Sequence, residues 1–177
     1  ITVEDGLKVS SNYVFRRLVS DNYLDCPYEF IDKLYEYNLH DAYAFDVTEV
    51  AESKPELPEI NPKMGKYDLV SSAIGYNVKE TPLNIVTFYN AIANNGKMMK
   101  PYLIESHEVD GKVVQKFGPE ILNASAFSKS TADSLTKALT MVTLEGTGAT
   151  RLKNAKCTVA GKTGTARMVL DQSERKG

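Results

Sequence analysis

The sequence predicts a helix-rich α/β fold of the α+β kind, with a few short strands. Two patterns lead to this prediction. Several stretches repeat apolar residues at helical spacing between recognisable caps, and one stretch alternates around an Asp-Gly pair. The chain has 177 residues, of which 42% are hydrophobic and 25% charged. That composition is typical of a globular domain large enough to bury a core.

The first part of the chain carries two helical patterns. Apolar residues over 5–20 suit one helical face and place Ser10 and Asn12 at or near its start; they are Leu7, Val14, Phe15, Leu18 and Val19. A second helix is predicted from Pro27, which suits the first helical position, to Tyr37. Its apolar stripe is expected to face a core.

A long surface loop is predicted from about 40 to 67, because helical spacing disappears and three prolines alternate with acidic residues. Thr81-Pro82 then opens a helix, cap followed by proline, which stops at Asn95-Gly96. Residues 129–145 return to helical spacing and end at Gly146. The middle of the chain is therefore expected to be mainly helical.

Strands are predicted in two places. Residues 100–117 alternate around Asp110-Gly111, which indicates a hairpin of two short strands. A last strand is predicted over roughly 157–169.

Charge and composition exclude several classes of partner. The formal net charge of −2, with both signs interspersed, gives no broad positive surface for nucleic acid. No apolar run approaches the roughly 20 residues that cross a bilayer, so the chain as given is expected to be soluble. Cys26 and Cys157 are too few and too far apart for a disulfide framework or a metal site, and we expect two unpaired thiols. No cofactor is predicted.

The run from Gly161 to Ala166, Gly-Lys-Thr-Gly-Thr-Ala, concentrates polar groups near the end of the chain. It is not a phosphate-binding loop, because that motif needs a glycine at the position of Lys156. On a strand, Lys162 and Gly164 are expected on one face, with Thr163 and Thr165 on the other.

These residue types suit a bound peptide. A lysine can anchor a carboxylate, and a glycine within a strand permits another backbone to lie close. We therefore expect an extended peptide to add alongside this strand, its terminal carboxylate held by Lys162 and hydroxyl donors. A solvated lysine and a bulge glycine remain the alternative.

A second cluster, Ser10-Ser11-Asn12, lies near the other end of the chain. Serine and asparagine are common helix caps, which is the simpler interpretation. A serine hydroxyl can also relay a proton to a leaving amine, and an asparagine amide can both donate to and accept from a peptide group.

Together, Ser-x-Asn and Lys-Thr-Gly-Thr resemble two of the three motifs of the penicillin-binding protein and serine β-lactamase superfamily. Residues 74–84, 88–97, Pro101 and 145–150 are similar to class B penicillin-binding proteins, and 88–97 most resembles the division-specific branch. The resemblance spans nearly the whole chain. It implies a partial transpeptidase domain over 1–177, holding only part of a five-stranded antiparallel sheet between helical layers.

The resemblance also implies roles for individual residues. Lys162, Thr163 and Thr165 would bind the carboxylate of the substrate or of a β-lactam, with Gly164 between them, and the Thr165 N–H would supply half of an oxyanion hole. Ser10 would be the proton shuttle, and Asn12 a contact for the substrate amide and a lysine. The implied reaction is serine acyl transfer from the D-Ala-D-Ala end of a peptidoglycan stem peptide.

One motif of the family is not found where its order requires it. The nucleophile belongs to a Ser-x-x-Lys helix that precedes Ser-x-Asn, and only nine residues stand before Ser10. Ser134 to Lys137 has this spelling but lies between the other two motifs, mid-helix. We therefore expect an inactive fragment that lacks the nucleophile helix and the C-terminal strands and helix, and that self-associates through an exposed strand edge.

Further expectations concern the parent protein. The family implies an inner-membrane anchor, an extracytoplasmic (periplasmic) domain, a role in cell wall synthesis during division or elongation, and a glycosyltransferase partner. Two alternatives stay open. One is a fragment of a penicillin-recognising sensor or β-lactamase, and the other is a non-enzymatic interaction module whose helices and acidic loop bind partners.

Overall fold

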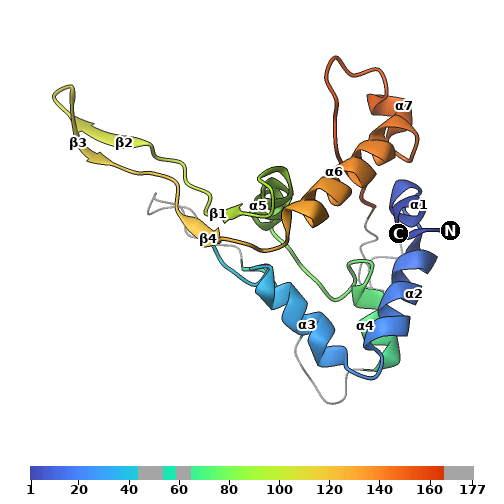
Figure 1. The fold of residues 1–177 in the computed structure, drawn as a ribbon. Coiled ribbons are helices and arrows are strands. Elements are labelled where there is room, and N and C mark those ends of the chain that lie inside the picture. The colour runs from blue at the N-terminus through green and yellow to red at the C-terminus, as the bar shows by residue number, and fades with distance from the viewer. Residues whose placement is uncertain (44–53, 59–64, 166–177) are drawn as a thin grey trace, which may run out of the picture.

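The computed structural model describes residues 1–43, 54–58 and 65–165. Helices dominate these residues, and the strands pair in two small antiparallel sheets, which confirms the predicted α+β class (Figure 1). The elements are α1 (Val3–Lys8), α2 (Asn12–Tyr23), α3 (Pro27–Glu36), α4 (Lys66–Ser72), α5 (Pro82–Ala93), β1 (Met98–Met99), β2 (Ser106–Val109), β3 (Lys112–Lys116), β4 (Ile121–Asn123), α6 (Lys129–Leu144) and α7 (Ala149–Leu152).

The helical pattern over 5–20 is divided between two helices, α1 and α2. Ser10 lies between them with a φ of 54°, in the left-handed region. The Ser11 N–H donates to the Gly6 carbonyl at 2.8 Å, and the Ser10 N–H donates to the Leu7 carbonyl at 3.1 Å. This pair of bonds is the Schellman ending of a helix, in which the left-handed residue is usually glycine. The expectation of one helix for the whole pattern was therefore wrong, because a serine occupies the position that ends α1. The expected helix start at or near Ser10 and Asn12 is confirmed, since α2 begins at Asn12.

Three predicted helices are confirmed with nearly the expected ends. Helix α3 begins at Pro27, and α5 begins after Thr81, whose side chain accepts from the Asn84 N–H. Helix α6 is capped by Ser128, whose hydroxyl accepts from the Thr131 N–H. In each case a residue that fixes φ or satisfies a free N–H marks the start of the helix.

The predicted loop over 40–67 is described only in part, since 44–53 and 59–64 lie outside the described residues. Its last two residues belong instead to α4, where Asp68 accepts from the Gly65 N–H. Glu56 pairs with Lys79 through a single antiparallel bridge and an ion pair of 2.6 Å. That bridge holds the short described part of the loop beside the start of α5.

The hairpin around Asp110-Gly111 is confirmed as β2 and β3. Both turn residues have positive φ, 51° and 73°, as a tight hairpin turn requires. Figure 1 shows this hairpin projecting away from the helices. A second pair, β1 with β4, was not predicted, because two- and three-residue strands leave no readable alternation.

The buried side chains lie mainly between α5, β1 and α6, and a smaller set joins α2, α3 and α4. The fully or almost fully buried apolar residues are Val19, Ile31, Leu69, Ala91, Ile92, Met98, Ala132, Ala138, Leu139 and Val142. The rings of Tyr37, Phe88 and Phe127 pack edge to face, with centroids 5.8 to 6.2 Å apart. These contacts join the end of α3 to α5. Among the described helices, none combines the length and apolar character needed to cross a membrane.

The predicted last strand is not found. Residues 157–165 carry no assigned strand, and the remainder of the predicted range lies outside the described residues. A strand is defined by its ladder to a neighbour, and in the described part of the chain the segment pairs with a helix instead. The Gly161 N–H donates to the Leu139 carbonyl of α6 at 3.2 Å.

Candidate active site

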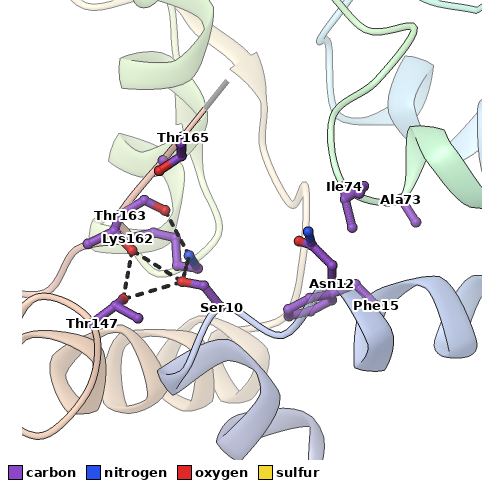
Figure 2. A pocket seen from close by; sticks show the side chains of 10 residues that line it. Ser10, Asn12, Phe15, Ala73, Ile74, Thr147, Lys162, Thr163 and Thr165 are labelled. Carbon is purple, nitrogen blue, oxygen red and sulfur yellow. Dashed lines mark hydrogen bonds between the residues drawn. The ribbon is translucent and has the colours of Figure 1, made fainter. Parts of the chain in front are cut away.

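A pocket of about 650 Å³ lies where the α1–α2 turn, the residues after α4, the α6–α7 turn and the segment 162–165 meet. All six residues named from the sequence line it: Ser10, Asn12, Lys162, Thr163, Gly164 and Thr165. Figure 2 shows the side chains of Lys162 and Thr163 turned toward Ser10. The fold therefore brings together two motifs that stand about 150 positions apart in the sequence.

Ser10 is the centre of the polar contacts. The Lys162 ammonium donates to the Ser10 Oγ at 2.5 Å, and the Thr163 hydroxyl lies 3.1 Å from the same oxygen. The Lys162 Nζ also donates to the Thr163 carbonyl at 2.8 Å. A lysine proton can therefore reach the serine hydroxyl directly, and the serine proton can be passed on.

Helix α6 positions the segment that carries Lys162. The buried Thr143 hydroxyl contacts the Val159 carbonyl, and the Gly161 N–H bonds to the Leu139 carbonyl. These two contacts fix the backbone immediately before Lys162. The cation is thus placed by a helix that is itself part of the core.

Asn12 is the first residue of α2, and Ser11 is the N-cap, since its hydroxyl accepts from the Val14 N–H at 3.4 Å. The capping interpretation of the Ser-Ser-Asn run therefore applies to Ser11. Figure 2 places the Asn12 amide on the Ile74 side of the pocket, separate from the Ser10 and Lys162 cluster. Asn12 therefore lines the pocket without contacting Ser10 or Lys162 in this view.

Four lining residues were not assigned a role from the sequence: Phe15, Ala73, Ile74 and Thr147. The first three make an apolar wall, and Phe15 and Ile74 stand opposite the lysine (Figure 2). Thr147 lies on the polar side, with its hydroxyl 2.6 Å from that of Thr163. The run from Glu145 to Thr150 stood out only as part of the family resemblance, which gave no role to any single side chain.

The pocket is electrostatically one-sided. Among the described residues that line it, Lys162 is the only charged one. Burial lowers the pKa of the Lys162 ammonium, because desolvation disfavours the charged form. A lysine that is partly desolvated and surrounded by hydroxyl groups attracts an anion and releases its proton more readily than a lysine in water. This arrangement can hold a carboxylate and assist proton transfer.

The expected alternation of side chains was wrong. Lys162 and Thr163 were placed on opposite faces of a strand, yet both contact Ser10. Without a sheet ladder the segment is not obliged to alternate. The Lys162 side chain also bends back toward its own backbone, to the Thr163 carbonyl.

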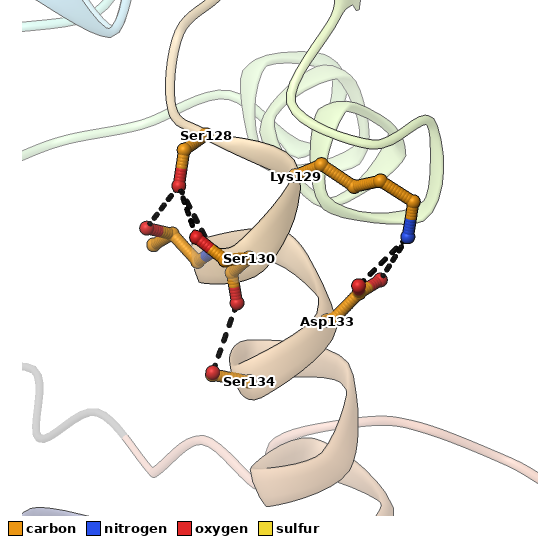
Figure 3. Close-up of polar contacts among 6 residues, drawn as sticks. Ser128, Lys129, Ser130, Asp133 and Ser134 are labelled. Carbon is orange, nitrogen blue, oxygen red and sulfur yellow. Dashed lines mark hydrogen bonds and ion pairs between the residues drawn. The ribbon is translucent and has the colours of Figure 1, made fainter.

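Ser134, which has a lysine three residues later, is remote from this pocket. It is exposed on α6, and its hydroxyl donates to the Ser130 carbonyl of the same helix at 2.9 Å (Figure 3). A hydroxyl that is bonded to its own helix and lies outside the pocket takes no part in the Ser10 and Lys162 contacts. Within 1–43, 54–58 and 65–165, no three His, Cys, Asp or Glu side chains cluster as metal ligands would.

Comparison with known proteins decides the family. The family model described as the penicillin binding protein transpeptidase domain matches residues 1–177. The chain belongs to the penicillin-binding protein transpeptidase family. This confirms the resemblance to class B penicillin-binding proteins that the motifs indicated.

Relatives of this transpeptidase chain include Penicillin-binding protein 2A of Bacillus subtilis, 32% identical over 113 residues, or 60% of the chain. The fold is similar to that of penicillin-binding protein 2B from Streptococcus pneumoniae, with a TM-score of 0.79 over 97% of the chain at 23% identity. It is also similar to penicillin-binding protein A from Mycobacterium tuberculosis in its penicillin G acyl-enzyme complex, with a TM-score of 0.66 over 80% of the chain at 23% identity.

The transpeptidase chain spans only part of these proteins. It covers 16% of the Bacillus relative and 31% of each of the two solved chains. The family is thus established for the chain, while the roles of Ser10, Asn12 and residues 162–165 stay predictions.

Proposed function

We propose that this chain is the part of a peptidoglycan D,D-transpeptidase that binds the stem-peptide terminus and moves the proton of the acyl transfer. The observation that supports this most directly is the contact of Lys162, Ser10 and Thr163 across one pocket. Family membership gives the reaction class, and the pocket supplies groups suited to it.

Substrate binding uses the one-sided charge of the pocket. The Lys162 ammonium and the hydroxyls of Thr163 and Thr165 take the C-terminal D-alanine carboxylate, while Gly164 leaves room for the peptide backbone. The Asn12 amide, on the opposite side, bonds the preceding peptide group. In a β-lactam, the carboxylate and the reactive carbonyl are arranged like those of the D-Ala-D-Ala terminus. We therefore expect a β-lactam to contact the same side chains.

Proton transfer follows from the chain of donors. A serine nucleophile, which we place on a Ser-x-x-Lys segment outside these residues, gives its proton to the lysine of that segment and attacks the penultimate D-alanine carbonyl. The Thr165 N–H helps to stabilise the oxyanion. As the bond to the terminal D-alanine breaks, the leaving nitrogen takes the Ser10 proton, and the Lys162 ammonium replaces it. The acceptor amine of a second stem peptide then attacks the ester and gives up a proton to Ser10, which passes its own proton to the now neutral Lys162. The bond to the serine nucleophile breaks, and that serine takes its proton back from the lysine of the Ser-x-x-Lys segment.

The cellular setting is part of the proposal. We place this domain outside the cytoplasmic membrane, anchored by a segment of the parent protein, and beside a glycosyltransferase that makes the glycan strands. Residues 88–97 favour the division-specific branch over the elongation branch.

The test is covalent labelling of the full-length protein by a fluorescent penicillin, followed by peptide mapping. We expect labelling of the wild-type protein at a serine outside residues 1–177. Ser10→Ala and Lys162→Ala should slow labelling at least about 100-fold, the usual contribution of acid–base catalysis. Ser134→Ala, which removes a hydroxyl outside the pocket, is the matched control and should label normally.

Three outcomes would contradict the proposal. An unlabelled wild-type protein would favour a non-enzymatic module, and a label on Ser134 would move the active site. Rapid hydrolysis of the penicillin, without D-alanine release from a stem pentapeptide, would indicate a β-lactamase.

A further inference from the structure

The turn between α6 and α7 enters the active site beside Ser10. Its Thr147 hydroxyl lies 2.6 Å from the Thr163 hydroxyl and 3.3 Å from the Ser10 hydroxyl (Figure 2). With the Ser10 to Thr163 distance of 3.1 Å, three hydroxyl oxygens form a closed triangle. Thr147 belongs to neither of the two sequence motifs that meet in the pocket.

The number of protons determines what this triangle can do. Each hydroxyl has one proton to donate and two lone pairs. Lys162 already donates to Ser10, which leaves Ser10 one lone pair and its own proton for the two threonines. Ser10 therefore donates to one threonine and accepts from the other, and the bond between the Thr147 and Thr163 hydroxyls completes the ring. In either direction of the ring, the Ser10 proton points to one of the two threonines.

The backbone holds Thr147 in place independently of its hydroxyl. The Thr147 N–H donates to the Lys8 carbonyl at 3.1 Å, and Glu145 forms an ion pair with the Lys8 ammonium at 3.7 Å. At Gly146 the approach is so close that a Cβ would lie 2.2 Å from the Lys8 carbonyl oxygen. Lys8 is two residues before Ser10, so the turn and the α1–α2 connection are joined where the hydroxyls meet.

We propose that Thr147 is a positioning residue for the proton shuttle, a role that rests on the proposed function. Its hydroxyl holds the Ser10 Oγ beside the Lys162 ammonium and limits rotation of the Ser10 proton. When substrate enters, the ring opens and the Ser10 proton is passed to the leaving nitrogen. Thr147 itself touches neither the scissile bond nor the nucleophile.

The experiment measures penicillin acylation of the full-length protein, resolved into non-covalent affinity and the rate of the acylation step. Thr147→Val keeps the shape but removes the hydroxyl, and it should slow acylation about fivefold with unchanged affinity, because one exposed neutral hydrogen bond contributes about 1 kcal/mol. Thr147→Ser should restore the rate. Thr140→Val, which removes a hydroxyl bonded to its own helix at 2.8 Å, is the matched control and should behave as wild type.

A double-mutant cycle tests whether Thr147 acts through Ser10. In a Ser10→Ala background, Thr147→Val should not slow acylation any further, because the hydroxyl that Thr147 positions is gone. Full additivity of the two losses would overturn the inference. A loss of affinity with an unchanged acylation rate would also overturn it, since Thr147 would then act on the carboxylate site through Thr163.

The same measurements separate this inference from the proposed function. If Ser10→Ala slows acylation and Thr147→Val leaves its rate unchanged, the positioning role is wrong while the proposed function stands. If Ser10→Ala is as fast as wild type, the proposed function is wrong. Should Thr147→Val fail to fold by thermal melting, Thr147→Ala compared with Thr147→Ser answers the same question.

Discussion

Two regions of the molecule are stabilised differently. The core between α5, β1 and α6 rests on apolar burial, whereas the pocket at the α1–α2 turn is held by polar contacts. In the core, side chains such as Ala91 and Val142 are at most 1% exposed. In the pocket, Thr147, Thr163 and Thr165 are exposed, and Ser10 has a backbone conformation that serine rarely adopts. Changes in the core are therefore expected to alter mainly the free energy of unfolding. Changes in the pocket are expected to alter mainly the rate of penicillin labelling.

The largest loss of stability is expected at Gly96, which follows α5. It has a φ of 89°, and a Cβ there would lie 1.9 Å from the Phe127 carbonyl oxygen. Gly96→Ala should lower the free energy of unfolding by about 3 kcal/mol, through steric overlap and left-handed strain together. Thermal melting of the full-length protein measures this.

Gly111→Ala is the matched control for Gly96→Ala. It has a φ of 73°, but a Cβ there would meet nothing within 4 Å. Gly111→Ala should lower the free energy of unfolding by only about 1 kcal/mol, because backbone strain is its single contribution. Equal losses for the two variants would show that backbone strain, and not packing against Phe127, dominates.

A smaller loss is expected at Gly146, where core and pocket meet. Gly146→Ala should lower the free energy of unfolding by about 2 kcal/mol, since its Cβ would overlap the Lys8 carbonyl. It should also slow penicillin labelling, because the overlap pushes Thr147 away from Ser10. Gly118→Ala, where a Cβ would meet nothing within 4 Å, should change neither property. Normal labelling by a destabilised Gly146→Ala protein would show that the pocket tolerates this displacement.

At Ser10, a glycine is expected to raise the free energy of unfolding instead of lowering it. Ser10→Gly relieves the left-handed strain and should raise the free energy of unfolding by up to about 1 kcal/mol. It should lower the labelling rate at least about 100-fold, because the hydroxyl is lost. Asn77→Gly, at a φ of 62° outside the pocket, should leave labelling unchanged. A Ser10→Gly protein less stable than wild type would mean that the hydroxyl contacts outweigh the strain.

The smallest effect is expected at Glu80, before α5, outside both regions. Burial raises the pKa of this carboxyl from 4.5 to about 7, and neither carboxylate oxygen has a hydrogen-bond partner among the described residues. The folded state therefore binds more protons than the unfolded state between these values, and stability falls as pH rises through them.

Replacing Glu80 with glutamine removes this titration. Glu80→Gln should match wild type near pH 4.5 and be more stable at pH 8 by about 1 kcal/mol, less than the full shift implies because Glu80 is partly exposed to solvent. Thermal melting across this pH range measures the difference. A constant difference at all pH values would assign the effect to packing and not to ionisation.

Local signals accounted for much of the fold. Pro27, Thr81-Pro82 and Asp110-Gly111 each act on the backbone next to them, so their helices and hairpin could be predicted without knowledge of distant residues. The division between α1 and α2 could not, because serine is rarely the residue that ends a helix in the left-handed conformation. Helix α4 followed a proline-rich stretch whose composition favoured a loop.

The sequence by itself determined which side chains are candidates for catalysis, since Ser-x-Asn and Lys-Thr-Gly-Thr are local motifs whose chemistry is carried by residue type. Only the tertiary structure decided that Lys162 reaches Ser10, and that Thr147 completes their hydrogen-bonded ring. The physical reason is that hydrogen bonds act over about 3 Å. Contacts between positions some 150 residues apart depend on how α6 and the α1–α2 turn pack, which no local motif encodes.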